Sequence, residues 1–428
     1  MKELFKTIIK DFHAQIPFRE VRKRELQIPL RSQKIISLTG PRRCGKTFYF
    51  YSLINRLMED VPVDRIIYIN FEDERMDIHS RELHLILDAY YELYPGNYNQ
   101  EIFVFFDEIQ NIDGWEAFVR RLNDTFHCHI FITGSSAKML GKEIATSLRG
   151  RSVNYQMFPL SFEEYCQFQG IDSGDVYSTP GKARLRSQFQ AYLKNGGYPE
   201  VLILPEELVN KTLQSYFDVM LFRDIVERYN VSNTVVLKQF IKKLVNTISS
   251  EFSIHKFYNE LKSQGISISK NTVYEYLEYA TDCFLLFLLL PYDPSLVRQQ
   301  TRSKKIYAVD TGLINAITYR FSQDRGKLLE NAVFLELSRR EMPLFYHKNQ
   351  FECDFIVQQE EAIKEAYQVS LTVSQTETRQ REIRALQKTM DKFNLSEGCI
   401  ITLDEEEDIE LNNKRIAIKP AWKWFLRT

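Results

Sequence analysis

Residues Lys34 to Leu57 read KIISLTGPRRCGKTFYFYSLINRL, and the expected fold of the N-terminal part follows from this segment. Its spacing, G-x-x-x-x-G-K-[ST] between an apolar strand and a helical pattern, is that of a phosphate-binding loop. Gly40 and Gly45 have no Cβ, so the backbone can curl and present successive N–H groups to phosphate oxygens. A chance glycine turn would not need both flanks. The predicted nucleotide-binding residues here are Gly40, Pro41, Arg42, Arg43, Cys44, Gly45, Lys46 and Thr47.

Two side chains of this loop have specific expected roles. Lys46 is expected to reach the β- and γ-phosphates, and the Thr47 hydroxyl is expected to complete the coordination of Mg²⁺. The helix that begins near Lys46 adds its positive N-terminal end to the anion site. ATP and Mg²⁺ are therefore the predicted cofactors.

A second motif lies further along the chain, where the apolar run Ile102 to Phe106 ends in Asp107 and Glu108. A continuously apolar strand is typical of a parallel sheet covered on both faces, and the carboxyl end of such a strand lies at the ligand crevice. We expect Asp107 to hold the hydration shell of Mg²⁺ and Glu108 to polarise the attacking water as a general base.

A third apolar strand, His129 to Thr133, is followed by Gly134-Ser135-Ser136. We expect this strand to end between the two earlier motifs, so that Thr133 or Ser135 senses the γ-phosphate. The helix-like segment 137–148 then leads to Arg149 and Arg151. Either these arginines act in trans on the transferring phosphoryl group, or they form a basic turn that binds a carboxylate.

Composition limits the class of protein. The 428 residues allow about three domains, and 44% hydrophobic residues support real cores. Lys and Arg number 56 against 57 for Asp and Glu, so net charge argues neither for nor against nucleic acid. The six scattered cysteines suit a reducing cytoplasm and offer no zinc site. The longest apolar run, Cys283 to Leu290, is too short to cross a bilayer. We expect a soluble cytoplasmic protein with no membrane partner.

Residues 233–310 have the pattern of a winged helix-turn-helix, with strand-like runs at Cys283–Leu290 and Lys304–Val309 as the wing. Basic residues in the wing, and the start of the second helix, are expected to contact DNA phosphates. Glu275 and Glu278 on that helix would repel DNA, which leaves docking of a protein partner as the alternative. The predicted DNA-binding residues are Lys270, Asn271, Tyr274, Arg298, Arg302, Lys304 and Lys305.

Taken together, these residues resemble prokaryotic AAA-family ATPases that carry a C-terminal restriction-endonuclease-like domain. Later segments also carry the resemblance: Phe158 to Glu164, Asn195 to Pro199, Lys305 to Gly312 and Leu328 to Asn331. It implies an α/β multidomain protein that forms a homo-oligomer. The implied domains are a P-loop AAA-type ATPase core with a parallel sheet at 1–158, a helical lid at 159–232, the winged helix-turn-helix at 233–310, and a restriction-endonuclease-like α/β domain at 311–428.

Nucleases of this kind bind Mg²⁺ through two acids and an E-x-K motif on adjacent strands. Glu330 and Asp354 match the two acids, but the third motif reads Gln368-Val369-Ser370 and lacks both the carboxylate and the lysine. Lys364 lies on the same strand face as Gln368. We expect a degenerate nuclease site at Glu330, Asp354, Gln368 and Ser370 that cuts poorly or not at all. Either the two acids keep some metal binding, or they merely pair with nearby bases.

The sequence thus supports three ordered hypotheses. The first is an ATPase that couples ATP binding and hydrolysis to DNA binding. The second is a nucleotide-gated switch that docks a protein and turns over slowly. An ATP-regulated, metal-dependent nuclease ranks last because of the missing third motif.

Overall fold

The computed structural model describes residues 1–16, 21–137, 146–318 and 325–427. The chain divides into two compact units, Met1–Met157 and Phe158–Thr428, here called unit 1 and unit 2. The expected ATPase core, 1–158, coincides with unit 1 to within one residue. Part of the helix expected at 137–148 lies outside the described residues.

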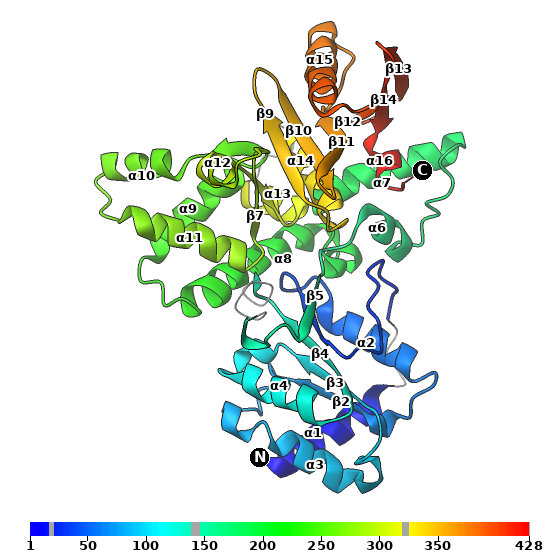
Figure 1. Cartoon of the computed structure of the whole chain (residues 1–428), viewed down its shortest axis with the longest axis vertical. Helices are drawn as coiled ribbons and strands as arrows, with labels where there is room; N and C mark the ends of the chain where they lie inside the picture. The colour runs from blue at the N-terminus through cyan, green and yellow to red at the C-terminus, as the bar shows by residue number, and fades with distance from the viewer. Residues whose placement is uncertain (17–20, 138–145, 319–324, 428) are drawn as a thin grey trace. The chain divides into compact units, whose positions relative to one another are not determined.

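Unit 1 is built on a five-stranded sheet in the order β2-β3-β4-β1-β5, in which every neighbouring pair is parallel (Figure 1). The strands are β1 (Ile35–Thr39), β2 (Ile66–Asn70), β3 (Ile102–Asp107), β4 (Cys128–Gly134) and β5 (Ser152–Gln156). The helices are α1 (Lys2–Gln15), α2 (Lys46–Leu57), α3 (Leu85–Leu93) and α4 (Trp115–Thr125).

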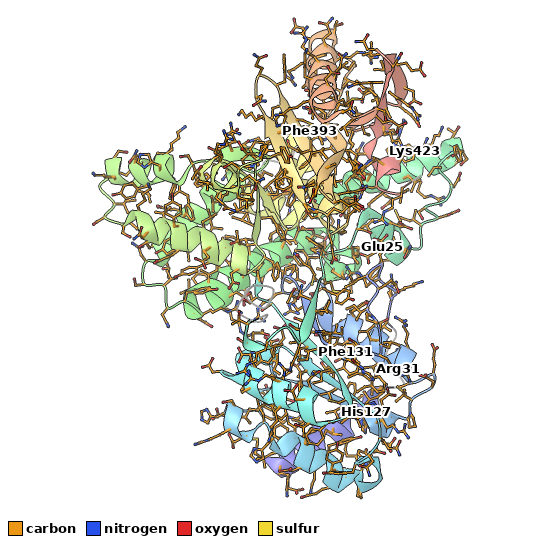
Figure 2. The ribbon with its side chains drawn as sticks, viewed as in Figure 1. Glu25, Arg31, His127, Phe131, Phe393 and Lys423 are labelled. Carbon is orange, nitrogen blue, oxygen red and sulfur yellow. The ribbon has the colours of Figure 1, made fainter. Side chains whose placement is uncertain are left out.

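Both faces of this sheet are buried, because successive side chains of each strand point to opposite faces. On one face Val104 and Phe106 of β3 pack with apolar residues of α1, α3 and α4. On the other face Phe103 and Phe105 pack with α2. Phe131 of β4 stacks on Phe105 with ring centroids 4.5 Å apart (Figure 2). The continuous apolar runs in the sequence therefore have the two-sided burial that they predicted.

Strand β4 lies between β1 and β3 and pairs with both, at Leu38 with Thr133 and at Phe106 with Ile132. The prediction that the third strand ends between the first two motifs is confirmed. Since parallel strands end at one edge of the sheet, this order brings the loop after β1 and the acids after β3 to the same place.

Unit 2 begins with helices and continues into a small antiparallel sheet of order β6-β8-β7. The first elements are α6 (Phe162–Phe168), α7 (Thr179–Asn195), α8 (Glu206–Val219) and a π-helix (Met220–Glu227). Next come α9 (Thr234–Asn246), β6 (Ser250–Phe252), α10 (Ile254–Ser263), α11 (Lys270–Asp282), β7 (Leu286–Leu289), α12 (Leu296–Thr301) and β8 (Lys304–Ala308). The side chains of Asn233, Ser253 and Ser269 cap α9, α10 and α11.

The rest of unit 2 contains a mixed six-stranded sheet of order β13-β14-β12-β11-β10-β9 (Figure 1). Its elements are α13 (Thr311–Thr318), α14 (Arg325–Ser338), β9 (Leu344–Lys348), β10 (Glu352–Gln359), β11 (Ala362–Val369), α15 (Thr376–Phe393), β12 (Glu397–Thr402), β13 (Glu407–Leu411), β14 (Lys414–Pro420) and α16 (Ala421–Trp424). Within the described parts of both units, no helix is long and apolar enough to cross a membrane.

Asp310 joins the end of α7 to the start of α13. Its carboxylate accepts hydrogen bonds from the backbone N–H of Gly197 at 2.7 Å and of Leu313 at 2.9 Å. The contact needs glycine at 196, because φ there is +79° and a Cβ would lie 2.0 Å from Asp310 Oδ1. A Cβ on Gly312 would likewise lie 2.1 Å from the carbonyl oxygen of Asn195. Two segments distant in the sequence are therefore in close backbone contact.

Burial raises the pKa of Asp310 to about 6, whereas an unfolded aspartate titrates near 4. Between these pH values only the folded state holds the proton, so the stability contributed by the proton is complete below about pH 4 and is lost as pH rises through about 6. The free energy of unfolding relative to Asp310→Asn should fall by about 2–3 kcal/mol over that range. Chemical denaturation followed by the fluorescence of Trp422 and Trp424, in a Trp115→Phe background, measures this.

An exposed Asp218→Asn variant is the control for this measurement. Its stability should differ from that of the parent protein by a constant amount at every pH. If Asp310→Asn also ran parallel to the parent, the buried carboxyl would not titrate in this range.

Candidate functional site

The loop between β1 and α2 depends on glycine at two positions. A Cβ on Gly40 would lie 2.2 Å from the carbonyl oxygen of Met157. Gly45 has φ +102°, a left-handed conformation that favours glycine, and it immediately precedes the first residue of α2. Arg43 also has positive φ, at 66°. The backbone therefore has the tight curl that the spacing of the motif predicted.

Lys46 is enclosed by this loop. Its Nζ donates to the carbonyl oxygens of Gly40 and Pro41, each at 3.1 Å, and lies 3.3 Å from Glu108 Oε1. Only 4% of the side chain is exposed. Burial by itself would lower the pKa of Lys46, but the nearby anionic groups, Glu108 foremost, outweigh burial and raise it. The ammonium is thus held charged at the mouth of the loop.

Asp107 gathers hydroxyl groups from other elements around a fully buried carboxylate. Its Oδ2 accepts from Thr47 of α2 at 2.7 Å and from Tyr68 of β2 at 2.9 Å. Its Oδ1 accepts from Thr133 of β4 in a short hydrogen bond. Burial raises the pKa of Asp107, with Glu108 adding to the effect, and the hydroxyl donors oppose the rise. The two predicted Mg²⁺ residues, Thr47 and Asp107, are in direct contact.

Glu108 is held in an unusual backbone conformation, with φ 53° in the left-handed region. Its N–H donates to Thr133 Oγ1 at 2.8 Å, and its Oε2 accepts from Gln110 Nε2 at 2.5 Å. Although burial would raise its pKa, Lys46 and Arg42 lower it. Glu108 is therefore an ionised carboxylate of fixed orientation beside Lys46, which suits a general base.

Other predicted residues of unit 1 have different surroundings. Arg42 pairs with Glu72 at 2.7 Å. Ser135 Oγ is buried and has no hydrogen-bond partner among the residues that the structure describes. Arg151 pairs with Asp124 at 2.6 Å, which is the carboxylate-binding alternative. Arg149 is exposed, with φ 50°, and has no ion pair in the described parts of the chain.

The sequence did not single out Tyr68, Gln110 or a pocket beside α2. The pocket has a volume of about 310 Å³, and Lys23, Arg24, Tyr49 and Arg56 are among the residues that line it. Arg24 also donates to the carbonyl oxygen of Cys44 in the phosphate loop at 2.9 Å. The pocket therefore borders the loop. Tyr68 and Gln110 gave no signal because each lies in a segment whose pattern is fully explained by the strand or turn.

In unit 2 the predicted DNA-binding residues fall into separate groups. Lys270, Asn271 and Tyr274 are exposed at the start of α11. Arg298 and Arg302 both pair with Asp293, at 3.2 and 3.5 Å. Lys304 is half-buried.

Lys305 was predicted to contact DNA, and this prediction is wrong. The residue is only 2% exposed, and its Nζ pairs with Glu330, Glu352 and Asp354. It points inward because it shares a face of β8 with the buried Tyr307.

The predicted nuclease residues are partly brought together. Glu330 of α14 and Asp354 of β10 meet at Lys305, so these acids do pair with a base. Gln368 of β11 accepts from the Asp354 N–H at 3.4 Å and donates to Glu382 at 2.7 Å. Ser370 is not part of this group, since its hydroxyl donates to the carbonyl oxygen of Thr372. Lys364 is exposed, and the register of β11 shifts beside it.

The order of the sheet, a phosphate loop after β1 and an acidic pair after β3 define unit 1 as a P-loop nucleotide-binding core. Comparison with protein families agrees: residues 32–166 match an AAA domain, and residues 186–324 match a domain of unknown function, DUF8612.

Two curated proteins are similar over most of their length. The chain is 38% identical to the uncharacterized protein MJ1544 of Methanocaldococcus jannaschii, covering 99% of this chain and 96% of that protein. It is 31% identical to an uncharacterized protein of Haemophilus influenzae, covering 77% of this chain and 80% of the relative. This chain, with its N-terminal AAA domain, therefore belongs to the same protein family as MJ1544.

Solved structures are similar only at a low level. The Aeropyrum pernix ORC1 protein in complex with DNA aligns over 76% of this chain and 94% of its own, with 13% identity and a TM-score of 0.30. PCH-2 of C. elegans aligns over 49% of this chain and 62% of its own, with 13% identity and a TM-score of 0.32. At such scores neither likeness supports an inference about this chain.

Thr133 links Asp107 to the backbone of Glu108, so Thr133→Val should disturb both acids. We expect ATP turnover to fall by about 10²-fold, because a misplaced catalytic group costs that much, while nucleotide affinity changes little. Steady-state kinetics and calorimetry with ATP and Mg²⁺ measure the two effects. Thr133→Ser keeps the hydroxyl and should retain most of the turnover. Equal rates for Val and Ser variants would show that the hydroxyl has no positioning role.

Proposed function

We propose that unit 1 binds ATP with Mg²⁺ and hydrolyses it. The observation that carries this proposal is the contact of Lys46 with Glu108 beside the buried Asp107–Thr47 pair. A phosphate-binding lysine, a metal-binding hydroxyl and carboxylate, and an oriented general base are the groups that phosphoryl transfer to water requires. The AAA-domain match over residues 32–166 supports the same activity.

The roles of the residues follow from their contacts. The loop N–H groups and Lys46 would bind the phosphates, and the γ-phosphate would replace Glu108 as the partner of Lys46. Glu108 would then be free to accept a proton from water. Thr47 and Asp107 would hold Mg²⁺, which supplies neutralisation of the phosphate charge. Thr133 and Ser135 would report on the γ-phosphate. The pocket at Arg24 borders the loop and is of a size to receive the nucleoside.

We further propose that the nucleotide cycle is coupled to DNA binding by a winged helix in unit 2. The order α9-β6-α10-α11-β7-β8 and the sheet order β6-β8-β7 support this interpretation. Lys270, Asn271 and Tyr274 are exposed at the first turn of α11, where a second helix would meet phosphates. The six-stranded sheet with α14 and α15 is proposed to be a restriction-endonuclease-like domain. All six cysteines are free, which suits action in a reducing cytoplasm.

A specific observation favours docking of a protein as the second candidate. Leu296 and Val297 lie side by side on α12, in the connection between β7 and β8, and are 75% and 73% exposed. Arg298 and Arg302 in the same connection are tied to Asp293, so less free positive charge remains for DNA than the sequence predicted. Adjacent exposed aliphatic residues suit contact with an apolar partner surface.

Replacing Lys46 or Glu108 separates binding from hydrolysis. Lys46→Ala should abolish ATP binding. Glu108→Gln should bind ATP but hydrolyse it about 10²- to 10⁴-fold more slowly, the usual contribution of a general base. Calorimetry and phosphate release measure these effects, and Lys211→Ala and Glu59→Gln, both on exposed residues, are controls. Unimpaired turnover by Glu108→Gln would contradict its assigned role.

Titration of the ATPase rate against DNA distinguishes the two candidate couplings. If DNA binds, duplex, junction or single-stranded DNA should raise turnover. In that case Lys270→Ala should weaken binding and reduce the salt slope by about one unit, whereas Leu296→Asp should leave DNA affinity intact. If no DNA form changes the rate or binds in a salt-dependent way, the docking function is favoured.

The exposed Arg149 is the better candidate for action in trans, because Arg151 is engaged by Asp124. We propose that subunits assemble so that Arg149 reaches the phosphates bound by a neighbour. Arg149→Ala should then lower turnover only in assemblies. Mixing it with Glu108→Gln subunits should restore activity, since each variant supplies what the other lacks. No recovery in the mixture would count against a finger in trans.

A further inference from the structure

Lys305 of β8 lies at the centre of three carboxylates in unit 2. Its Nζ is 3.2 Å from Glu330 Oε1, 2.8 Å from Glu352 Oε1 and 2.9 Å from Asp354 Oδ1. The lysine side chain is 3% exposed, and those of Glu330 and Asp354 are 14% and 10% exposed. A buried cation is thus enclosed by acids from α14 and from one face of β10.

The hydrogen-bonding capacity of this ammonium is fully used. An ammonium has three N–H donors and no acceptor, and one oxygen from each of the three acids is within reach of Nζ. Other groups also contact the same acids. Asp354 Oδ2 accepts from the Val369 N–H at 3.0 Å, Glu330 Oε1 accepts from Tyr307 at 2.7 Å, and Glu352 Oε2 lies 3.3 Å from Lys348. The acids are therefore oriented around a single central cation.

Carboxylates converging from a helix and a strand are also the ligands that hard divalent cations prefer. Here the central point is occupied by Lys305, and a metal ion could not share it with an ammonium. Among the described residues, no group of three or more His, Cys, Asp or Glu side chains has the arrangement of a metal site. Gln368, the residue next to Asp354 on β11, offers a neutral amide that is already engaged with Glu382.

We propose that the ammonium of Lys305 takes the place of a divalent cation in this centre, so that a metal ion enters only when the ammonium is removed. The centre thereby stays charge-compensated and closed to Mg²⁺, while Lys305 joins the three-stranded sheet to α14 and β10. This inference does not rest on the ATPase activity proposed for unit 1.

Binding of Mn²⁺ to the full chain tests the proposal. All proteins carry Asp107→Asn, which removes the proposed metal ligand of unit 1. Mn²⁺ is titrated by calorimetry and by electron paramagnetic resonance of the free ion. With Lys305 present we expect no Mn²⁺ bound up to millimolar concentration. Lys305→Met should bind one Mn²⁺ per chain, lose it when Asp354→Asn is added, and melt several degrees higher with Mn²⁺ than without, since a ligand that binds the folded state stabilises it.

Two matched variants sharpen the test. Lys348→Met removes a lysine that contacts Glu352 from outside the centre, and Lys305→Arg keeps a central cation; neither should bind Mn²⁺. The proposal is overturned if folded Lys305→Met binds no Mn²⁺, or if the protein with Lys305 binds Mn²⁺ in a manner that Asp354→Asn abolishes. If Lys305→Met folds only with Mn²⁺ present, that dependence supports the proposal. If it never folds, Mn²⁺ binding by the Lys305 and Lys305→Arg proteins decides, with absence as the supporting result.

Discussion

The buried carboxylate of Asp107 is the constraint on which unit 1 depends. An anion removed from water needs hydrogen-bond donors, and Asp107 takes them from Thr47, Tyr68 and Thr133. These residues come from α2, β2 and β4, so the ends of three elements must converge on the last residue of β3. The strand order makes this possible, because β4 is inserted between β1 and β3. Sheet topology and site chemistry are thus one requirement.

Much of this arrangement could be predicted, because its signals are local. The glycine spacing before Lys46 and the acids that end the β3 run each specify a backbone shape or a position at a strand end, and both follow from a few neighbouring residues. Tyr68 could not be found in this way. It lies inside an apolar strand where a tyrosine needs no explanation, and its contact with Asp107 depends on the pairing of β2 with β3.

The assignment of Lys305 failed for a different reason. Lysine is almost never fully buried unless it is paired, so a basic segment next to a predicted wing was interpreted as solvent-exposed. Alternation along β8 places Lys305 on the side of Tyr307, and the acids that compensate it come from α14 and β10, which follow later in the chain. Local charge indicated a surface for DNA, whereas the tertiary structure uses the same charge inside unit 2.

The contact of Asp310 with Gly197 has a consequence for how this family can vary. It fixes together two points that are 113 residues apart in the chain, and the close backbone approach at Gly196 and Gly312 fixes them tightly. The intervening segment is therefore a closed excursion whose entrance and exit coincide. Such a cassette can be exchanged for one of another length or specificity without moving the elements outside it, because a replacement has only to begin and end at the same place.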